Sequence, residues 1–449
     1  MSRIVAIIDG EHYPPVVRAA LEELGASHDV VAAVFVGGTE KVDASGPVEY
    51  GVPLVRGATA ESALREAVRA YGPEAAIDLS DEPVLSSAGR FRLASVALEC
   101  GITYMGADFQ FDPPLVETET STPTIVIVGT GKRVGKTAVS AHVARILQAG
   151  GMRPVVLAMG RGGPAVPELL RGDAIALTTA DLLEFARRGA HASSDNYEDA
   201  VMARVPTVGC RRCGGGMAGS VFYSNVAEGA RLADSLGLGV LLLEGSGAAV
   251  PPVRADATML VVGAAQGAGI LSDYFGPLRL ATADAIVIAG AEPALVAPEV
   301  VETMLAEARA ARPDARVCAI TFRPRPLEPV AGRRAFLATT APAVLLPLLR
   351  EYLEREHGCT VVAASAHLSD RERLRADLAA AAGSFDVVLT ELKAAAIDVV
   401  AEAGEAAGVP TVLVDNVPVT VAGDDLDETA LQLAGLAARR AEARRTDGC

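Results

Sequence analysis

The stretch Thr124-Ile-Val-Ile-Val-Gly129-Thr-Gly-Lys-Arg-Val-Gly135-Lys136-Thr137 decides the fold of this 449-residue chain. An apolar run that reads as a buried strand leads into glycines and then into Lys136 and Thr137, where a helix is expected to begin. The glycines let backbone N–H groups wrap around a phosphate, and the helix N-terminus adds unsatisfied N–H donors. The stretch therefore predicts a phosphate-binding loop, or P-loop, in an α/β fold.

This loop predicts binding of ATP and Mg²⁺. Lys136 is expected to reach the β- and γ-phosphates, and the Thr137 hydroxyl is expected to bind the magnesium ion. Five residues rather than four separate Gly129 from Gly135, which is an unusual spacing. The alternative is a glycine-rich turn without a ligand. The candidate nucleotide-binding residues of the loop are Gly129, Thr130, Gly131, Lys132, Arg133, Val134, Gly135, Lys136, Thr137 and Ala138.

A second apolar run ends in a carboxylate, in the order Leu-Leu-Leu-Glu244-Gly-Ser-Gly. A charged side chain at the end of a buried strand is costly unless it has a partner. Magnesium is the expected partner, which makes Glu244 a metal ligand together with Thr137. A carboxylate in a salt bridge at the strand end is the alternative.

The whole chain repeats a rhythm of strands and helices, which predicts an α/β fold with parallel sheets. We expect an N-terminal Rossmann-like α/β domain at residues 1–115, a linker at 116–123, a P-loop NTPase domain with a parallel sheet at 124–330, and a C-terminal α/β extension at 331–449. The extension is either a separate small domain or a continuation of the P-loop sheet. The residues from Asp424 onward are expected to form a surface helix.

Composition and charge narrow the classes of partner. The formal net charge of −16 does not suit a nucleic acid, because neutralising its phosphates needs clustered Lys and Arg. No apolar run is long enough to span a membrane. The first strand follows Met1 and Ser2 directly, which leaves no room for a secretory signal, so a cytoplasmic location is expected. The apolar, alanine-rich composition leads us to expect a homodimer.

Several segments resemble known families. Gly-Thr-Gly-Lys-Arg-Val-Gly-Lys-Thr at 129–137 is similar to the P-loop of dethiobiotin synthetase, which also has the extra residue, and 241–247 is similar to that family's strand ending in Glu-Gly-Ala-Gly. Over most of its length the chain looks more like cyclic 2,3-diphosphoglycerate synthetase, a larger family of the same P-loop branch. The segments that carry this resemblance are the loop itself, 158–168, 209–219, 242–247 and 390–398.

The resemblance implies a reaction in which ATP and 2,3-bisphosphoglycerate give ADP, phosphate and a cyclic phosphoanhydride. ATP would phosphorylate one phosphate of the substrate, and the neighbouring phosphate would then close the ring. Such chemistry depends on positioning and on charge neutralisation more than on side-chain nucleophiles. A kinase acting on 2-phosphoglycerate would share Lys136, Thr137 and Glu244 and is the alternative within enzymes.

Arginines are expected to hold a substrate that carries several negative charges. Arg161 lies in a Gly-Arg-Gly-Gly-Pro turn and is expected to face the γ-phosphate. Arg211 and Arg212, followed by three glycines, are expected to form a mobile basic loop that clamps the bisphosphate. Arg323 follows a late strand, where it is expected to stack on adenine or contact phosphate. For each of the four, an exposed loop arginine is the alternative. The candidate catalytic residues are thus Lys136, Arg161, Glu244, Arg211 and Arg212.

Cys210 and Cys213 flank two of these arginines and suggest a function of another class. A Cys-x-x-Cys pair would suit a nucleotide-switch protein or a metallochaperone, but a structural zinc site needs four ligands and the chain has no second such pair. Lys393 follows a strand near an expected helix N-terminus, where a lysine opposes the helix dipole. We therefore expect it to point at an anion.

Overall fold

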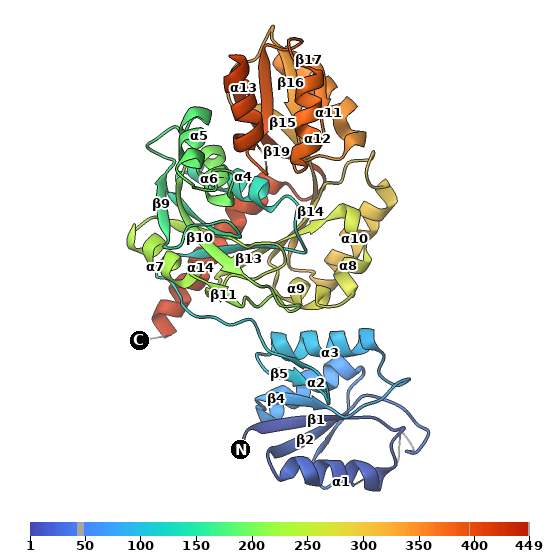
Figure 1. Ribbon diagram of the computed structural model, residues 1–449. Coiled ribbons are helices and arrows are strands. Elements are labelled where there is room, and N and C mark those ends of the chain that lie inside the picture. The colour runs from blue at the N-terminus through green and yellow to red at the C-terminus, as the bar shows by residue number, and fades with distance from the viewer. Residues whose placement is uncertain (43–48, 395, 448–449) are drawn as a thin grey trace. The chain divides into compact units, whose positions relative to one another are not determined.

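The computed structural model describes residues 1–42, 49–394 and 396–447 (Figure 1). The last cysteine of the sequence, Cys449, lies outside these ranges. They divide into two compact units. The first unit contains Met1–Leu115 and two short later segments, Met217–Ser220 and Gly269–Thr282, and the second unit contains the remainder. Strands and helices alternate throughout, which confirms the predicted α/β class. The domain boundaries expected from the sequence stay a prediction.

The first unit is a six-stranded sheet in the order β3-β2-β1-β4-β5-β6, parallel except for β6. Strand order reverses between β1 and β4, as in Rossmann-like folds. The strands are β1 (Arg3–Ile8), β2 (Asp29–Phe35), β3 (Leu54–Val55), β4 (Ala75–Asp78), β5 (Thr103–Met105) and β6 (Gln110–Phe111). The helices are α1 (Pro14–Gly25), α2 (Ala60–Tyr71), α3 (Ser87–Glu99), α8 (Gly269–Ser272) and α9 (Gly276–Thr282).

The second unit is built on one sheet in the order β11-β10-β8-β12-β7-β13-β14-β15-β19-β18-β16-β17, with β9 paired to β10. The P-loop part contains β7 (Thr124–Gly129), β8 (Pro154–Gly160), β9 (Glu168–Arg171), β10 (Pro206–Cys213), β11 (Tyr223–Ser224), β12 (Val240–Glu244), β13 (Ala257–Gly263), β14 (Ala285–Ala289) and β15 (Arg316–Pro326). The C-terminal extension contains β16 (Arg334–Ala338), β17 (Thr360–Ser365), β18 (Val387–Glu391) and β19 (Thr411–Gly423). The extension therefore continues the P-loop sheet, the second of the two arrangements considered from the sequence.

The sheet reverses direction between β15 and β19, which are antiparallel. Ala289, at the end of β14, pairs with Ile320 of β15. Glu391, at the end of β18, pairs with Val414 of β19, and Val414 in turn pairs with Pro326 of β15. Glu391 therefore lies at the level of Pro326 along β15. The carboxyl ends of the two parallel halves thus point toward each other. Six residues of β15 separate the two levels, which corresponds to about 20 Å along an extended strand.

The helices of the second unit are α4 (Lys136–Ala149), α5 (Thr179–Arg187), α6 (Asp195–Ala203), α7 (Val226–Ser235), α10 (Pro298–Ala311), α11 (Leu346–His357), α12 (Arg371–Ala380), α13 (Glu402–Ala407) and α14 (Leu426–Asp447). Short turns of other helix types are η1 (Ala264–Gln266), η2 (Ala343–Leu345) and the π-helix η3 (Ala396–Ala401). The terminal helix α14 is a surface helix, as expected, with one face exposed and the other packed on the sheet. Its leucine and alanine face, including Leu433 and Ala437, is buried in the same core as α4 and β7.

Candidate functional site

The P-loop joins β7 to α4 and has the backbone that its sequence predicts. Gly135 caps α4 with φ of 91°, a left-handed conformation that favours glycine. A Cβ atom at Gly129 would lie 2.8 Å from Cδ of Lys136, so the glycine leaves room for the lysine side chain. Lys136 is buried and its Nζ donates a hydrogen bond to the carbonyl of Gly131 at 2.8 Å. Burial lowers the pKa of Lys136, an effect that the Glu244 carboxylate opposes.

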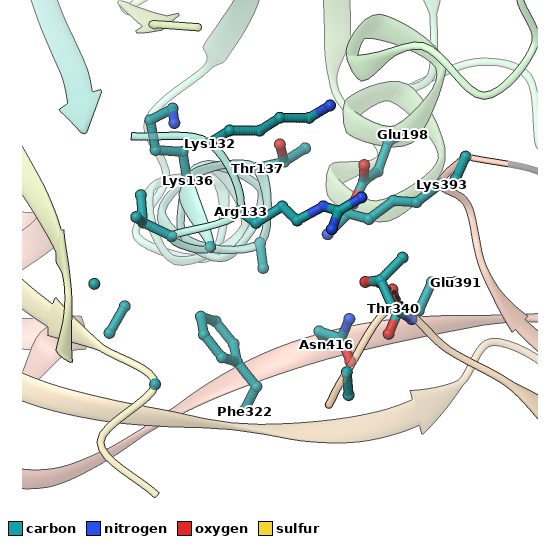
Figure 2. Close-up of a pocket in the computed structure, with 18 of the residues that line it drawn as sticks. Lys132, Arg133, Lys136, Thr137, Glu198, Phe322, Thr340, Glu391, Lys393 and Asn416 are labelled. Atoms are coloured by element: carbon teal, nitrogen blue, oxygen red, sulfur yellow. Dashed lines mark hydrogen bonds and ion pairs between the residues drawn. The ribbon is translucent and has the colours of Figure 1, made fainter. Parts of the chain in front are cut away.

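A cavity of about 640 Å³ lies beside the P-loop, within the size range of small-molecule sites. Residues 132–138 line it from the P-loop, while Thr340, Glu391 and Lys393 line it from the C-terminal extension. Figure 2 shows these two sets of side chains pointing into one space, above Phe322 and Asn416 of the long antiparallel strands. The cavity therefore lies between the two opposed carboxyl edges of the sheet. Gly129, Thr130 and Gly131 form the first half of the loop and are not among its lining residues.

Thr137 and Glu244 meet at this cavity. The Thr137 hydroxyl donates a hydrogen bond to Oε1 of Glu244 at 2.7 Å. Burial raises the pKa of Glu244 to about 7, and the Asp195 carboxylate adds to this effect. Burial and the Glu244 carboxylate also raise the pKa of Asp199 well above its usual range. In the described residues no donor reaches Oε2 of Glu244 or either carboxylate oxygen of Asp199, so these buried oxygens are open to a cation or a shared proton.

The three candidate arginines near the P-loop have different surroundings. Arg161 lines the cavity, as predicted from its turn. Arg212 donates to the carbonyl and hydroxyl of Ser246, a cavity residue, at 2.7 and 3.1 Å. Arg211 instead donates through Nε to the carbonyls of Gly163 and Pro164 at 3.1 and 2.7 Å and is not among the residues that line the cavity.

The prediction of a mobile basic loop at Arg211 and Arg212 is wrong, because both residues lie in β10. Successive side chains of a strand point to opposite faces. Arg212 does not line the cavity itself but contacts Ser246, which does, while Arg211 fixes the turn that carries Arg161. The same alternation separates Cys210, which is buried against Gly229, from Cys213, which is exposed.

Sequence comparisons agree with this arrangement of domains. Family models of cyclic 2,3-diphosphoglycerate synthetase match the chain in succession, the N-terminal domain at residues 3–112, the P-loop domain at 124–321 and the C-terminal domain at 326–417. The cyclic 2,3-diphosphoglycerate synthetase of Rubrobacter xylanophilus is 47% identical over 441 residues, which cover 97% of this chain and 98% of that protein. The chain belongs to the cyclic 2,3-diphosphoglycerate synthetase family.

Other members of the cyclic 2,3-diphosphoglycerate synthetase family match equally broadly. The protein of Methanothermobacter thermautotrophicus is 43% identical over 442 residues, covering 96% of this chain and 95% of its own. That of Thermococcus kodakarensis is 46% identical over 432 residues, covering 96% of this chain and 98% of its own. The resemblance inferred from the P-loop and its neighbouring segments is thus confirmed, and the metallochaperone alternative is not favoured.

Arg323 lies at the end of the cavity where apolar side chains gather. It donates to Oε2 of Glu292 at 2.7 Å, and its guanidinium lies 6.0 Å from the ring centre of Tyr352. The apolar residues that line this end of the cavity are Ala289, Leu295, Phe322, Pro342, Leu345 and Leu349. The position of Arg323 between a carboxylate and this apolar wall suits an aromatic base better than a bare phosphate.

Helix α6 supplies cavity residues that the sequence analysis did not propose. Its carboxylates Asp195, Glu198 and Asp199 are spaced i, i+3 and i+4, a spacing that places them on one side of a helix. Asp195 and Glu198 line the cavity, and Asp199 adjoins Glu244. The spacing was visible in the sequence as Ser194-Asp195-Asn-Tyr-Glu198-Asp199.

Among the helices within residues 1–42, 49–394 and 396–447, none combines the length and the apolar character that a membrane span requires. In the same residues, no three His, Cys, Asp or Glu side chains converge as a metal site of their own.

Proposed function

We propose that the chain closes 2,3-bisphosphoglycerate into cyclic 2,3-bisphosphoglycerate at the expense of ATP. The observation that carries this proposal is a P-loop that faces a cation-lined cavity in a chain of this synthetase family. An oxygen of one substrate phosphate attacks the γ-phosphorus of ATP, and ADP leaves. The neighbouring phosphate then attacks the phosphorus of the activated phosphate, and inorganic phosphate leaves as the ring closes.

The side chains of the P-loop region neutralise charge and orient the phosphates in both steps. Backbone N–H groups of the loop and the Lys136 ammonium hold the β- and γ-phosphates. Lys136 must leave the Gly131 carbonyl to do so. Arg161 meets the charge that develops on the transferred phosphoryl group. Arg212 shapes the Ser246 loop beside it, and Arg211 acts as a positioning residue for the turn of Arg161.

Magnesium would be held by Thr137 and Glu244. The fit rests on the open Oε2 of Glu244 and on the hydroxyl of Thr137 beside it. Two protein oxygens suit Mg²⁺, which usually keeps several waters and takes further ligands from the nucleotide phosphates. When bound, the ion neutralises charge on the β- and γ-phosphates. Asp199 adjoins Glu244, and the Glu244 carboxylate helps to raise the pKa of Asp199.

The adenine base would occupy the apolar end of the cavity. A planar base fits between partly exposed side chains such as Phe322, Leu345 and Leu348, which otherwise border empty space. Arg323, held by Glu292, is placed to stack on the base or to contact its edge. The C-terminal extension thus takes part in nucleotide binding.

A homodimer in the cytoplasm completes the proposal. The proposed dimer rests on the apolar, alanine-rich composition. Sedimentation velocity of the purified chain tests the assembly, and a single species of about 46 kDa would contradict the dimer.

Phosphorus NMR of ATP, Mg²⁺ and 2,3-bisphosphoglycerate with the purified chain tests the reaction. We expect ADP, inorganic phosphate and a cyclic phosphoanhydride to appear in equal amounts, and none of them with Lys136→Ala. Inorganic phosphate without any change in the bisphosphoglycerate signals would reduce the chain to an ATPase. Conversion of 2-phosphoglycerate with ATP, without release of phosphate, would instead favour the kinase.

A further inference from the structure

Lys393 enters the cavity from the C-terminal extension. It follows Glu391, the last residue of β18, and precedes Ala394, whose φ of 48° is left-handed. Such a conformation is uncommon for a residue other than glycine, and strained backbone of this kind concentrates at functional sites. The π-helix η3 begins two residues later, at Ala396. The backbone around Lys393 is therefore shaped in an unusual way to present this side chain.

Glu198 of α6 fixes the ammonium group of Lys393. The distance from Nζ of Lys393 to Oε1 of Glu198 is 3.2 Å, and only 7% of Glu198 is exposed. Burial alone would lower the pKa of Lys393, but the carboxylates of Glu198 and Glu391 outweigh it and raise that pKa, so the lysine stays charged. A buried ion pair is weak evidence for stability, because desolvation offsets much of the attraction. A role toward a ligand explains the pair better.

The position of Lys393 opposite the P-loop indicates which ligand it meets. The P-loop and Lys136 account for the nucleotide phosphates on one edge of the cavity, whereas Lys393 comes from the opposed edge of the sheet (Figure 2). In phosphoryl transfer the attacking oxygen lies roughly in line with the leaving ADP, on the far side of the γ-phosphate. A cation on the wall facing the P-loop is thus placed for the acceptor rather than for the nucleotide.

We propose that Lys393, positioned by Glu198, forms a phosphate subsite that binds the acceptor phosphate of the bisphosphorylated substrate. This inference rests on the proposed function. The ammonium group neutralises part of the repulsion between the acceptor phosphate and ATP, and it fixes the attacking oxygen at the γ-phosphorus. Glu198 does not touch the substrate and acts by holding the lysine side chain in place.

The test compares Lys393→Met, Lys393→Arg and the double variant Lys393→Met/Glu198→Gln. The single Met variant leaves the Glu198 carboxylate buried without its partner, which by itself can destabilise the protein. The double variant removes both charges and separates this structural effect from a role at the substrate. Each variant is checked by thermal unfolding and by titration with a fluorescent ATP analogue before steady-state kinetics with both substrates.

We expect the double variant to melt within a few degrees of the wild type and to bind the ATP analogue normally. Its kcat/KM for 2,3-bisphosphoglycerate should fall by about 10- to 100-fold, the range for loss of one charged hydrogen-bond donor, while the KM for ATP changes little. Lys393→Arg should recover part of the loss. Recovery of kcat/KM in the double variant, or an equal rise in both KM values, would overturn the subsite.

The failure of this inference is distinct from a failure of the proposed function. If the wild type forms no cyclic product, the proposed function fails and the subsite falls with it. If the wild type cyclises and the double variant does so with an unchanged kcat/KM for 2,3-bisphosphoglycerate, only the subsite is refuted.

Discussion

Replacing Glu244 by glutamine should stabilise the protein while it removes activity. Glu244 is 2% exposed, and burial raises its pKa from 4.5 to about 7 in the folded chain. The difference of about 2.5 pKa units corresponds to about 3 kcal/mol. Folding must supply this free energy whenever the carboxyl group would be ionised in the unfolded chain.

The sign of the effect fixes its pH dependence. Below about pH 4.5 the carboxyl group is protonated in both states, and the penalty is absent. Between pH 4.5 and 7 the unfolded chain ionises while the folded chain keeps its proton, so the wild type loses stability as pH rises. Above pH 7 the penalty is complete. Glutamine never ionises, and its carbonyl can still accept the hydrogen bond from Thr137, so the variant escapes the penalty.

Urea unfolding without nucleotide or divalent metal, at pH 5, 7 and 8.5, measures this gain. We expect Glu244→Gln to be more stable than the wild type by about 3 kcal/mol at pH 8.5 and by much less at pH 5. The matched control is Glu351→Gln, at a side chain that is 77% exposed, which should change stability by less than about 0.5 kcal/mol at every pH. A gain that is independent of pH, or a loss at pH 8.5, would refute the reasoning.

Four further substitutions test the P-loop and its arginines. Lys136→Ala should abolish turnover without changing the melting temperature by more than a few degrees, and near-normal turnover would remove the P-loop from the mechanism. Arg161→Ala should lower kcat by about 100-fold with little change in stability. Arg211→Ala should lower kcat and also the melting temperature, because the Arg211 guanidinium donates to two backbone carbonyls. Identical effects of the two variants on kcat and melting temperature would contradict their separate roles. Gly135→Ala places a Cβ atom 2.4 Å from Cζ of Phe322 at a left-handed φ, so it should cost about 2 to 5 kcal/mol in urea unfolding. A cost below about 1 kcal/mol would show that the loop adapts freely.

Local patterns in the sequence were sufficient for the P-loop and for Glu244. The strand that precedes Gly129 and the helix that begins at Lys136 are both visible as short-range signals, and a carboxylate that closes an apolar strand stands out for the same reason. These features depend on neighbours within a few residues. The structure places Thr137 and Glu244 in contact, as the two separate patterns predicted.

The parts of the site that depend on long-range packing could not be read in this way. Nothing local shows that Glu198 meets Lys393, because these residues are far apart in the chain and meet only after the sheet has reversed at β15 and β19. The error at Arg211 and Arg212 had another cause. The glycines that follow these arginines suggested a loop, yet Arg211 pairs with β8 and Arg212 pairs with β11, so the strand extends through both of them.

Late synthesis of β19 and α14 has a consequence for the nascent chain. Both elements lie near the end of the described sequence, yet β19 borders the cavity through Asn416 and α14 completes the core beneath the P-loop. While the chain is still on the ribosome, the P-loop sheet lacks α14, which covers it, and β19, which pairs it with the C-terminal extension. A partly synthesised chain therefore has an incomplete ATP-binding cavity, although the first unit already has all six of its strands. Chains that stall or are truncated before α14 leave exposed the apolar surface that this helix covers, and exposed surface of this kind favours aggregation.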